Sequence, residues 1–463
     1  MIITFLGRGN KTEETKRPKY TFDDRLSEKF KLKKNNYTNM LPLLIDNFPD
    51  EKIIPVYTED AKNTQIPVLE DEFGKTCEEL FDDAFKIEDT KDFSSIMRLL
   101  NRVISQDEDY IIDLTHSFRH LPILATISLI SNQTLDTNRV KHIFFAKEKI
   151  PNTKETIGEY EIIDLKNYLE LANVSYMLST FNQNYTVSGN MEFTNPLYQQ
   201  LANQLKHFSE HFLSNSLKAI IDEEMIDDIF DVFDKLDKEE DIANLNNFIT
   251  KIKSHLQTIK ALKNSQSEYE KFYELSKIMD DRGYQLNAIT LLFEAIGYYC
   301  LEKIYTNVPS AKKHIDRFQT FIREQKQPQN VYSDYTLTNQ SRNIIKLRKR
   351  FTGDFLFNPQ TVDWTRKELK STPYNLLPKE ATKKLKKDIF NYLDKLPAHQ
   401  LKDLTQYIRD MEALRNNLAH GNSSKPIDNI ENLFSKYTKT FKNLILDEDV
   451  LQPETFNQIK IKR

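Results

Sequence analysis

The sequence of 463 residues has little of what disulfide-bonded or zinc-binding proteins depend on. Its only cysteines, Cys77 and Cys300, are far apart, so neither a disulfide framework nor a cysteine zinc site is expected, and a reducing cytoplasm fits. The nine histidines show no paired spacing with carboxylates of the kind that zinc sites have. We therefore expect no metal centre.

Long hydrophobic runs are also missing. The longest apolar stretch, around Leu121 to Ile130, is too short and too interrupted to span a bilayer. Residues 1–6 have neither a basic lead nor a small-residue cleavage site, so they predict a buried strand rather than a signal peptide. The net charge of -4 means that the surface as a whole does not attract nucleic acid, and any RNA site must be a local patch.

The first 165 residues alternate between strand and helix patterns. A chain of 463 residues is too long for one ordinary core, so two or three domains are expected. Alternating strands and helices predict a mostly parallel sheet with right-handed crossovers, which is a Rossmann-like α/β domain. The expected strands are 2–6, 53–57, 110–114 and 140–146, and the expected helices are 71–85, 93–105, a segment from Pro122, and a pattern carrying Phe22, Leu26, Phe30, Met40, Leu41, Leu44 and Ile45.

Two loops follow the carboxyl ends of predicted strands, where parallel sheets bind ligands. In the first loop, glycines let a ligand approach the backbone and amides can form an anion nest, although a plain turn is the alternative. In the second, hydroxyls and an arginine can hold phosphates, and the aromatic ring can stack on a base or fill the core. For its histidines the alternative is helix capping and packing. The loops are Gly7, Arg8, Gly9 and Asn10, and Thr115, His116, Ser117, Phe118, Arg119 and His120.

From residue 166 the helical periodicity predicts an all-α remainder of the chain. We interpret 166–275 as a helical connector and 276–463 as a separate helical domain, with 351–378 as an insertion. Glu294 is polar in an apolar context, so it either reaches a site or lies on the surface. A basic cluster, Arg342 with Lys346–Arg350, either follows an RNA backbone or is a solvated face.

The segment Glu412–Gly421 reads Glu-Ala-Leu-Arg-Asn-Asn-Leu-Ala-His-Gly and predicts the end of a helix, since Gly421 is where a helix would stop. Its candidate catalytic residues are Arg415, Asn416 and His420. An arginine can hold a phosphate with its planar fork of donors, and a histidine can move protons near neutral pH. These groups suffice to cleave RNA without a metal, because the substrate's own 2′-hydroxyl is the nucleophile.

Two interpretations of this segment without a catalytic role stay open. Glu412 could simply pair with Arg415, three residues later on the same helix. His420 could serve only as a helix-end histidine that favours the C-terminal dipole. Against them, Met411, Leu414 and Leu418 form an apolar stripe on another face and leave the polar residues at an edge, where a second copy of the helix could meet them.

Arg415-Asn416 followed by His420 resembles the signature of HEPN ribonucleases. Over roughly the first 165 residues, Asp113–Arg119 and Phe5–Asn10 resemble the two motifs of one branch of CRISPR-associated CARF domains. Arg8 departs from that branch, which more often has a small residue between the glycines. The chain as a whole thus resembles the CARF–HEPN ribonucleases, accessory effectors of type III CRISPR defence.

The resemblance implies a homodimer that binds a cyclic oligoadenylate across its two-fold axis as an allosteric activator, with tetra-adenylate preferred to hexa-adenylate. It also implies a HEPN nuclease that cuts single-stranded RNA and leaves 2′,3′-cyclic phosphate and 5′-hydroxyl ends. Two alternatives remain. His116, Ser117 and Arg119 could degrade the cyclic ligand, or the chain could be a sensor that controls a partner without cutting RNA.

Overall fold

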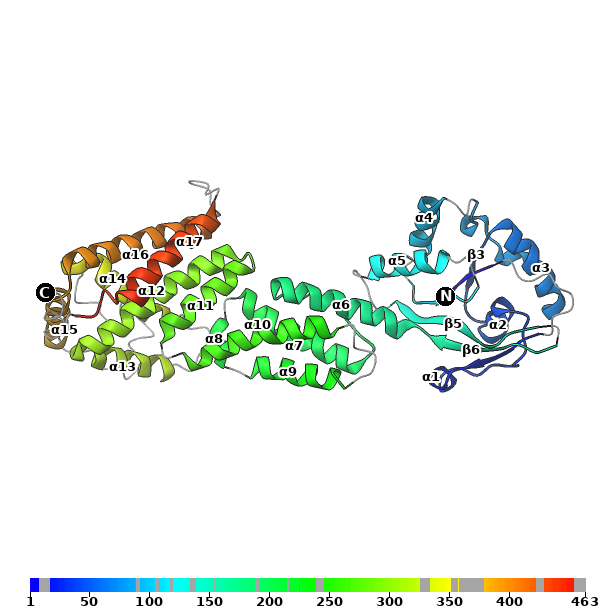
Figure 1. Cartoon of the computed structure of the whole chain (residues 1–463), viewed down its shortest axis with the longest axis horizontal. Coiled ribbons are helices and arrows are strands. Elements are labelled where there is room, and N and C mark those ends of the chain that lie inside the picture. Colours follow the sequence, from blue (N-terminus) through cyan, green and yellow to red (C-terminus); the bar gives the residue numbers. More distant parts are fainter. Residues whose placement is uncertain are drawn as a thin grey trace. The chain divides into compact units, whose positions relative to one another are not determined.

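The chain divides into two compact units (Figure 1). The computed structural model describes residues 1–7, 17–88, 92–104, 108–116, 120–133, 139–153, 155–187, 191–214, 216–222, 224–238, 245–265, 267–324, 334–350, 357, 379–421 and 429–453. The first unit is Met1–Glu210 with Asp227–Lys253, and the second is His211–Ile226 with Ser254–Arg463. The domain boundaries predicted from the sequence at residues 165 and 275 stay predictions.

The first unit contains a six-stranded sheet in the order β2-β6-β5-β4-β1-β3. Pairs β1–β3, β1–β4, β4–β5 and β2–β6 are parallel, and β5–β6 is antiparallel. The register places Thr4 opposite both Pro55 and Asp113. The strands are β1 (Ile2–Phe5), β2 (Lys19–Phe22), β3 (Ile53–Val56), β4 (Tyr110–Asp113), β5 (Val140–Ile150) and β6 (Glu159–Asp164).

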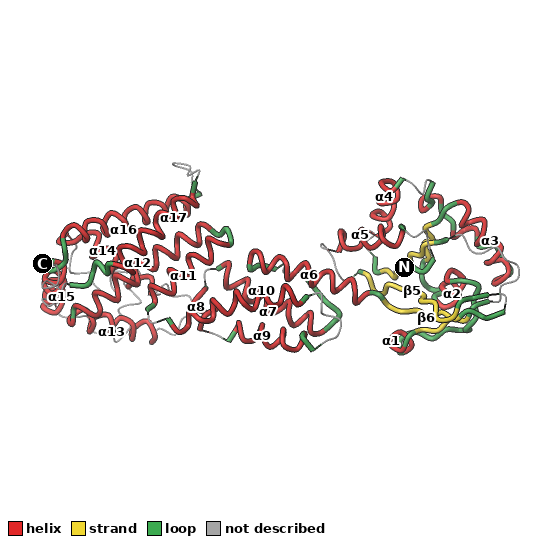
Figure 2. Tube along the Cα trace, viewed as in Figure 1, coloured by secondary structure: helices red, strands yellow, loops and turns green. Residues whose placement is uncertain are grey.

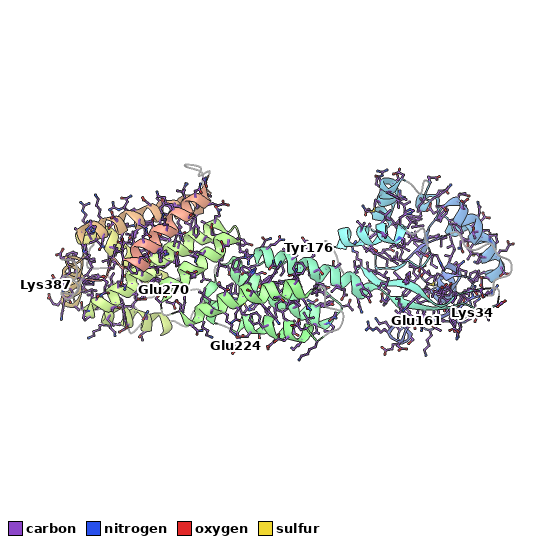
Figure 3. The ribbon with its side chains drawn as sticks, in the orientation of Figure 1. Lys34, Glu161, Tyr176, Glu224, Glu270 and Lys387 are labelled. Atoms are coloured by element: carbon purple, nitrogen blue, oxygen red, sulfur yellow. The ribbon has the colours of Figure 1, made fainter. Side chains whose placement is uncertain are left out.

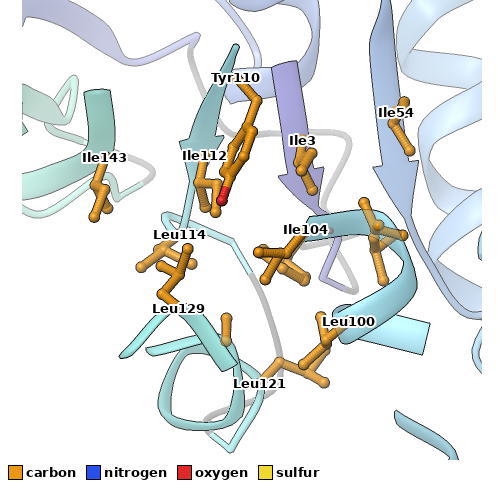
Figure 4. Packing of buried hydrophobic residues seen from close by; sticks show 14 of the residues in the cluster. Ile3, Ile54, Leu100, Ile104, Tyr110, Ile112, Leu114, Leu121, Leu129 and Ile143 are labelled. Carbon is orange, nitrogen blue, oxygen red and sulfur yellow. The ribbon is translucent and has the colours of Figure 1, made fainter. Parts of the chain in front are cut away.

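Helices cover both faces of this sheet because its central strands are apolar on both sides. Ile3 and Ile112 pack with α4 and α5 on one face (Figure 4), whereas their neighbours Ile2 and Ile111 pack with α2 on the other. Strands buried on both faces are characteristic of parallel sheets. The helices here are α1 (Asp24–Ser27), α2 (Met40–Asn47), α3 (Glu59–Phe73), α4 (Phe93–Ile104) and α5 (Leu121–Gln133).

The sequence interpretation missed two strands and was wrong for parts of two expected helices. It missed β2 and β6, which are short and mostly half-buried, so they lack the continuous apolar run of the central strands. It also placed Phe22 in a helix, whereas Phe22 ends β2. The helix expected over 71–85 is wrong because α3 ends at Gly74, whose φ of 69° is left-handed, and two short 3₁₀ turns follow, Glu78–Leu80 and Asp83–Phe85.

The described part of the chain after β6 is helical, as predicted (Figure 2). Apolar residues recur there at helical spacing and are buried, Leu205 and Phe208 in α7 and Ile229 and Phe233 in α9 among them. Tyr176, in contrast, is 53% exposed on α6 (Figure 3). The helices are α6 (Lys166–Asn184), α7 (Pro196–Leu213), α8 (Leu217–Asp222), α9 (Met225–Leu236) and α10 (Asn246–Ala261).

The second unit is built around α12 (Gln285–Asn307), which packs against α11, α13, α14, α16 and α17. Its core residues recur at helical spacing and are buried, Leu292, Ile296 and Tyr299 among them. The predicted fold class, an α/β sheet domain followed by a helical half, is therefore confirmed. The remaining helices are α11 (Glu268–Asp281), α13 (Pro309–Glu324), α14 (Asp334–Leu347), α15 (Lys379–Leu393), α16 (Ala398–Ala419) and α17 (Ile430–Phe441).

The chain after α17 returns to α12 through a polar contact. A π-helix, Lys442–Asp447, leads to Asp449, whose φ of 44° lies in the left-handed region. The Asp449 carboxylate accepts from the Tyr299 hydroxyl at 2.8 Å and from the Lys303 ammonium at 2.7 Å. The Tyr299 oxygen in turn accepts from the Leu451 amide at 2.8 Å. These bonds hold the end of the described chain on the central helix.

Candidate functional site

The first candidate site lies at the point in the first unit's sheet where the strand order reverses. Strand β1 lies between β3 and β4, so the chain places one later strand on each side of it. In such sheets the crevice beyond the carboxyl ends of the two neighbouring strands is the usual ligand site. Gly7 follows β1 and Thr115 follows β4, so both predicted ligand loops begin at this edge.

A buried carboxylate joins the strand ends beneath these loops. Asp113 Oδ2 accepts from the Thr4 hydroxyl at 2.7 Å, and Oδ1 accepts from the Thr115 amide at 3.0 Å and its hydroxyl at 2.6 Å. The amide of Ala146 on β5 donates to the Thr115 oxygen at 2.9 Å. One chain of hydrogen bonds therefore fixes β1, β4 and β5 and sets the position from which the second loop departs.

Burial governs the charges at this edge. It raises the pKa of the Asp113 carboxyl above its usual range, although hydrogen bonds from Thr115 and Thr4 oppose the change. It also lowers the pKa of His116, against the attraction of Asp113. Nε2 of His116 is buried and has no hydrogen-bond partner within the described residues. A neutral imidazole with an unsatisfied nitrogen is suited to bind a polar ligand group.

The predicted ligand residues fall into two groups. Gly7, Thr115, His116 and His120 are described, whereas Arg8, Gly9, Asn10, Ser117, Phe118 and Arg119 lie outside the described residues. The carbonyl of His120 accepts the Leu124 amide at 3.0 Å, and its ring lies 5.2 Å from that of Phe93. These contacts match the capping and packing alternative for His120.

Sequence reasoning did not assign Thr4 and Asp113 to the site. A carboxylate at the end of an apolar strand was a usable signal, because a buried acid needs donors. Thr4 carried no signal, because its role depends on the β1–β4 register.

The second candidate site is the end of α16 in the second unit. Met411 and Leu414 are buried, as the apolar stripe predicted. The helix ends where expected: the His420 amide donates to the Asn416 carbonyl at 3.0 Å, and Gly421 has a left-handed φ of 78°. The sequence thus folds locally so that the polar residues Arg415, Asn416 and His420 lie in its last turns.

These three residues are accessible to solvent to different degrees. Asn416 and His420 are exposed, and Arg415 is half-buried. Arg415 Nη1 donates to the Asn416 side-chain oxygen at 3.1 Å. Asn416 therefore orients the guanidinium, a contact that the sequence reasoning did not foresee. The arrangement offers a phosphate-binding cation and a histidine at one exposed helix end.

Arg415 does not pair with Glu412 in the structure, contrary to one of the two non-catalytic interpretations. Glu412 instead binds the Lys346 ammonium of α14, at 2.7 and 3.0 Å from its two oxygens. Within the described part of the chain Arg415 makes no ion pair.

The proposed basic cluster includes one residue that cannot contact RNA. Arg342 is 1% exposed and lies over the Phe293 ring, 4.0 Å from its centroid. Its two terminal nitrogens each lie 3.2 Å from the Glu294 carboxylate, which also accepts from the Thr338 hydroxyl at 2.9 Å. Both readings of Glu294, a site residue or a surface residue, are therefore wrong: it is the partner of a buried arginine.

The described ranges contain neither a metal-binding cluster nor a membrane-spanning helix. No group of three or more histidine, cysteine, aspartate or glutamate side chains there is arranged to hold a metal ion. Among the helices that the structure describes, none combines the length and apolar character needed to cross a membrane.

No protein-family model matches the sequence. The chain is 24% identical over 176 residues to CRISPR-associated protein MJ1674 of Methanocaldococcus jannaschii, which is 37% of this chain and 26% of that protein. The chain thus spans about a quarter of the length of this relative. A solved structure, Enterococcus italicus Csm6 bound to cyclic hexa-2′-fluoro-hexa-dAMP, has a TM-score of 0.28 and 11% identity over 98% of this chain and 95% of that one. The chain is therefore similar to a CRISPR-associated protein, as its resemblance to the CARF–HEPN family predicted.

Proposed function

We propose that this protein is a CARF–HEPN effector of type III CRISPR defence, a single-stranded RNA endonuclease activated by a cyclic oligoadenylate. The observation that carries the proposal is the end of α16, where Arg415, Asn416 and the exposed His420 lie within two turns. The similarity to a CRISPR-associated protein supports it, and so does the fact that both predicted ligand loops begin at the sheet edge that binds ligands in α/β folds.

In the proposed reaction the 2′-oxygen of RNA attacks the adjacent phosphorus and the bond to the 5′-oxygen breaks. Arg415 orients the phosphate and stabilises the charge that builds on its oxygens. His420 takes the proton of the 2′-hydroxyl or gives one to the leaving 5′-oxygen, with the second copy of the helix supplying the other group. Asn416 holds the arginine in place. The products carry 2′,3′-cyclic phosphate and 5′-hydroxyl ends, and no metal takes part.

The activator binds at the edge beyond β1 and β4 in two subunits. Its phosphates contact the loops at 7–10 and 115–120, and the neutral His116 accepts a hydrogen bond from a ribose hydroxyl or an adenine amine. The helices of 166–275 transmit the change to a composite nuclease site of two second units. A ligand activates only if it binds the active arrangement more tightly than the resting one.

The test of the RNA half compares cleavage products. An RNA carrying one labelled phosphate, incubated with the protein and an activator, should yield 2′,3′-cyclic phosphate ends, and Arg415→Ala should abolish them. Products with 3′-hydroxyl ends, or an absolute requirement for a divalent metal, would refute the mechanism.

A second function is favoured by the unsatisfied His116 nitrogen at the sensor edge: slow cleavage of the cyclic ligand itself. The catalytically disabled Arg415→Ala, His420→Ala double variant separates the two activities. Linear products from labelled cyclic tetra-adenylate in that variant, absent after His116→Ala is added, would establish degradation. Unchanged cyclic ligand would leave the first unit as a sensor only.

A further inference from the structure

We propose that Lys346 is a positioning residue for the nuclease site: it holds Glu412 and so keeps the Arg415 guanidinium available to bind a phosphate. This rests on the proposed function, which assigns Arg415 to the scissile phosphate. Lys346 and Glu412 are 66 residues apart in the sequence, and the structure joins them by a two-oxygen ion pair.

The position of Lys346 follows from the buried arginine one turn earlier on α14. Arg342 donates to the Phe293 carbonyl at 2.9 Å as well as to both Glu294 oxygens, all on α12. A buried, multiply bonded arginine fixes the rotation and register of its helix against its neighbour. Lys346 is four residues later, so it lies on nearly the same face of α14.

The α14–α16 contact then directs Lys346 to Glu412. Thr405 lies two turns before Glu412 on α16, and its hydroxyl donates to the Leu401 carbonyl of α16 at 2.7 Å and lies 3.4 Å from the Ile345 carbonyl oxygen of α14, so the two helices are adjacent here. The Lys346 side chain is 18% exposed and that of Glu412 34%. A partly buried pair is screened less by salt than a fully exposed one.

Without Lys346, Glu412 has a second partner within reach. Arg415 is three residues later on the same helix, and glutamate–arginine pairs at this spacing attract each other. Such a pair would place a carboxylate where the phosphate must bind. In the structure the guanidinium instead contacts the neutral Asn416 amide, and no carboxylate within the described residues pairs with it.

The experiment measures how fast phenylglyoxal modifies Arg415 in the full chain, by mass spectrometry of its peptide, without RNA. Lys346→Ala should slow modification by about twofold, the equivalent of one i,i+3 ion pair. Adding Glu412→Gln should restore the original rate, since the competing carboxylate is gone. The matched control, Lys383→Ala, removes a 74% exposed lysine that pairs with Glu380 and should change nothing.

The direction of the change in the Arg415 modification rate distinguishes the possible outcomes. If Lys346→Ala only loosened the helix, Arg415 would react faster, and that result would overturn the proposal. An unchanged rate, or a slow rate that persists in the Lys346→Ala, Glu412→Gln double variant, would also overturn it.

The same variants in the RNA assay test the consequence for function. Lys346→Ala should raise the KM for RNA severalfold, with a smaller change in kcat. Adding Glu412→Gln to this variant should restore the wild-type KM. If the wild-type protein cuts no RNA, the proposed function fails, yet the modification rates still decide whether Lys346 controls Arg415.

Discussion

A methyl group added at Gly297 tests the buried ion pair that positions α14. Alanine is favoured over glycine inside a helix by about 1 kcal/mol, so at an open position Gly297→Ala would stabilise the protein. Gly297 is not at an open position. A Cβ there would lie 2.3 Å from Nη1 of Arg342 and 2.6 Å from Cβ of Thr338, both on the neighbouring helix.

The expected loss of stability follows from the displacement of Arg342 by the added methyl group. Arg342 is buried and its two terminal nitrogens donate to Glu294 and the Phe293 carbonyl, so displacing it weakens several bonds at once. Overpacking a core costs about 1–3 kcal/mol, and breaking a buried ion pair outright costs about 3–5 kcal/mol. With partial displacement and the gain in helix propensity, we expect a net loss of about 2 kcal/mol.

Hydrogen exchange of the α12 and α14 peptides in the full chain measures this loss directly, because exchange reports the opening free energy of those helices. Gly297→Ala should speed exchange in both helices. In an Arg342→Ala background, where the nearest obstructing atoms are gone, the same change should cost less. Slower exchange in Gly297→Ala than in the wild type would refute the account of this packing.

Three further predictions concern the two units separately. Because burial lowers the pKa of His116 below 6.5, the unfolded chain binds more protons at mildly acidic pH and stability falls as pH drops below about 6.5. Between pH 7.5 and pH 5.5 the free energy of unfolding, measured with denaturant, should drop more for the wild type than for His116→Gln. Asp113, whose pKa is raised, contributes to the pH dependence of this free energy with the opposite sign in both proteins. Thr4→Val removes one donor from the buried Asp113 and should destabilise the first unit by about 1–3 kcal/mol in the same assay, whereas an unchanged midpoint would show that the bond is dispensable. Tyr299→Phe removes the hydroxyl that joins Asp449 and the Leu451 amide, so exchange of the 442–453 peptide should accelerate severalfold while that of α14 stays unchanged.

The central strands and the long helices could be predicted because each carries a local pattern. The central strands β1 (Ile2–Phe5) and β4 (Tyr110–Asp113) are buried along their whole length and are mostly apolar, and helical stripes mark α12 and α16. Strands β2 and β6 could not be predicted in this way, because they are short and only partly buried. Their pairing with each other joins segments about 140 residues apart, which no local window contains.

The same distinction between local patterns and long-range contacts applies to the candidate sites. The end of α16 was predictable from Gly421 and the apolar stripe, since both are local signals. The Asp113 network and the Lys346–Glu412 pair depend on strand register and helix packing, so they became visible only in the structure. Arg342 was assigned to a basic surface cluster because it lies near other basic residues in the sequence. That assignment was wrong, because the fold buries Arg342.

The most direct test of the central proposal is cleavage of a fluorogenic single-stranded RNA in the presence of EDTA. Cyclic tetra-adenylate and cyclic hexa-adenylate are added in turn to the wild type and to His420→Ala. The account predicts cleavage that requires one of the two rings and disappears in the variant. Cleavage that persists in His420→Ala would show that His420 is not the proton-transfer group, and no cleavage with either ring would contradict the nuclease assignment.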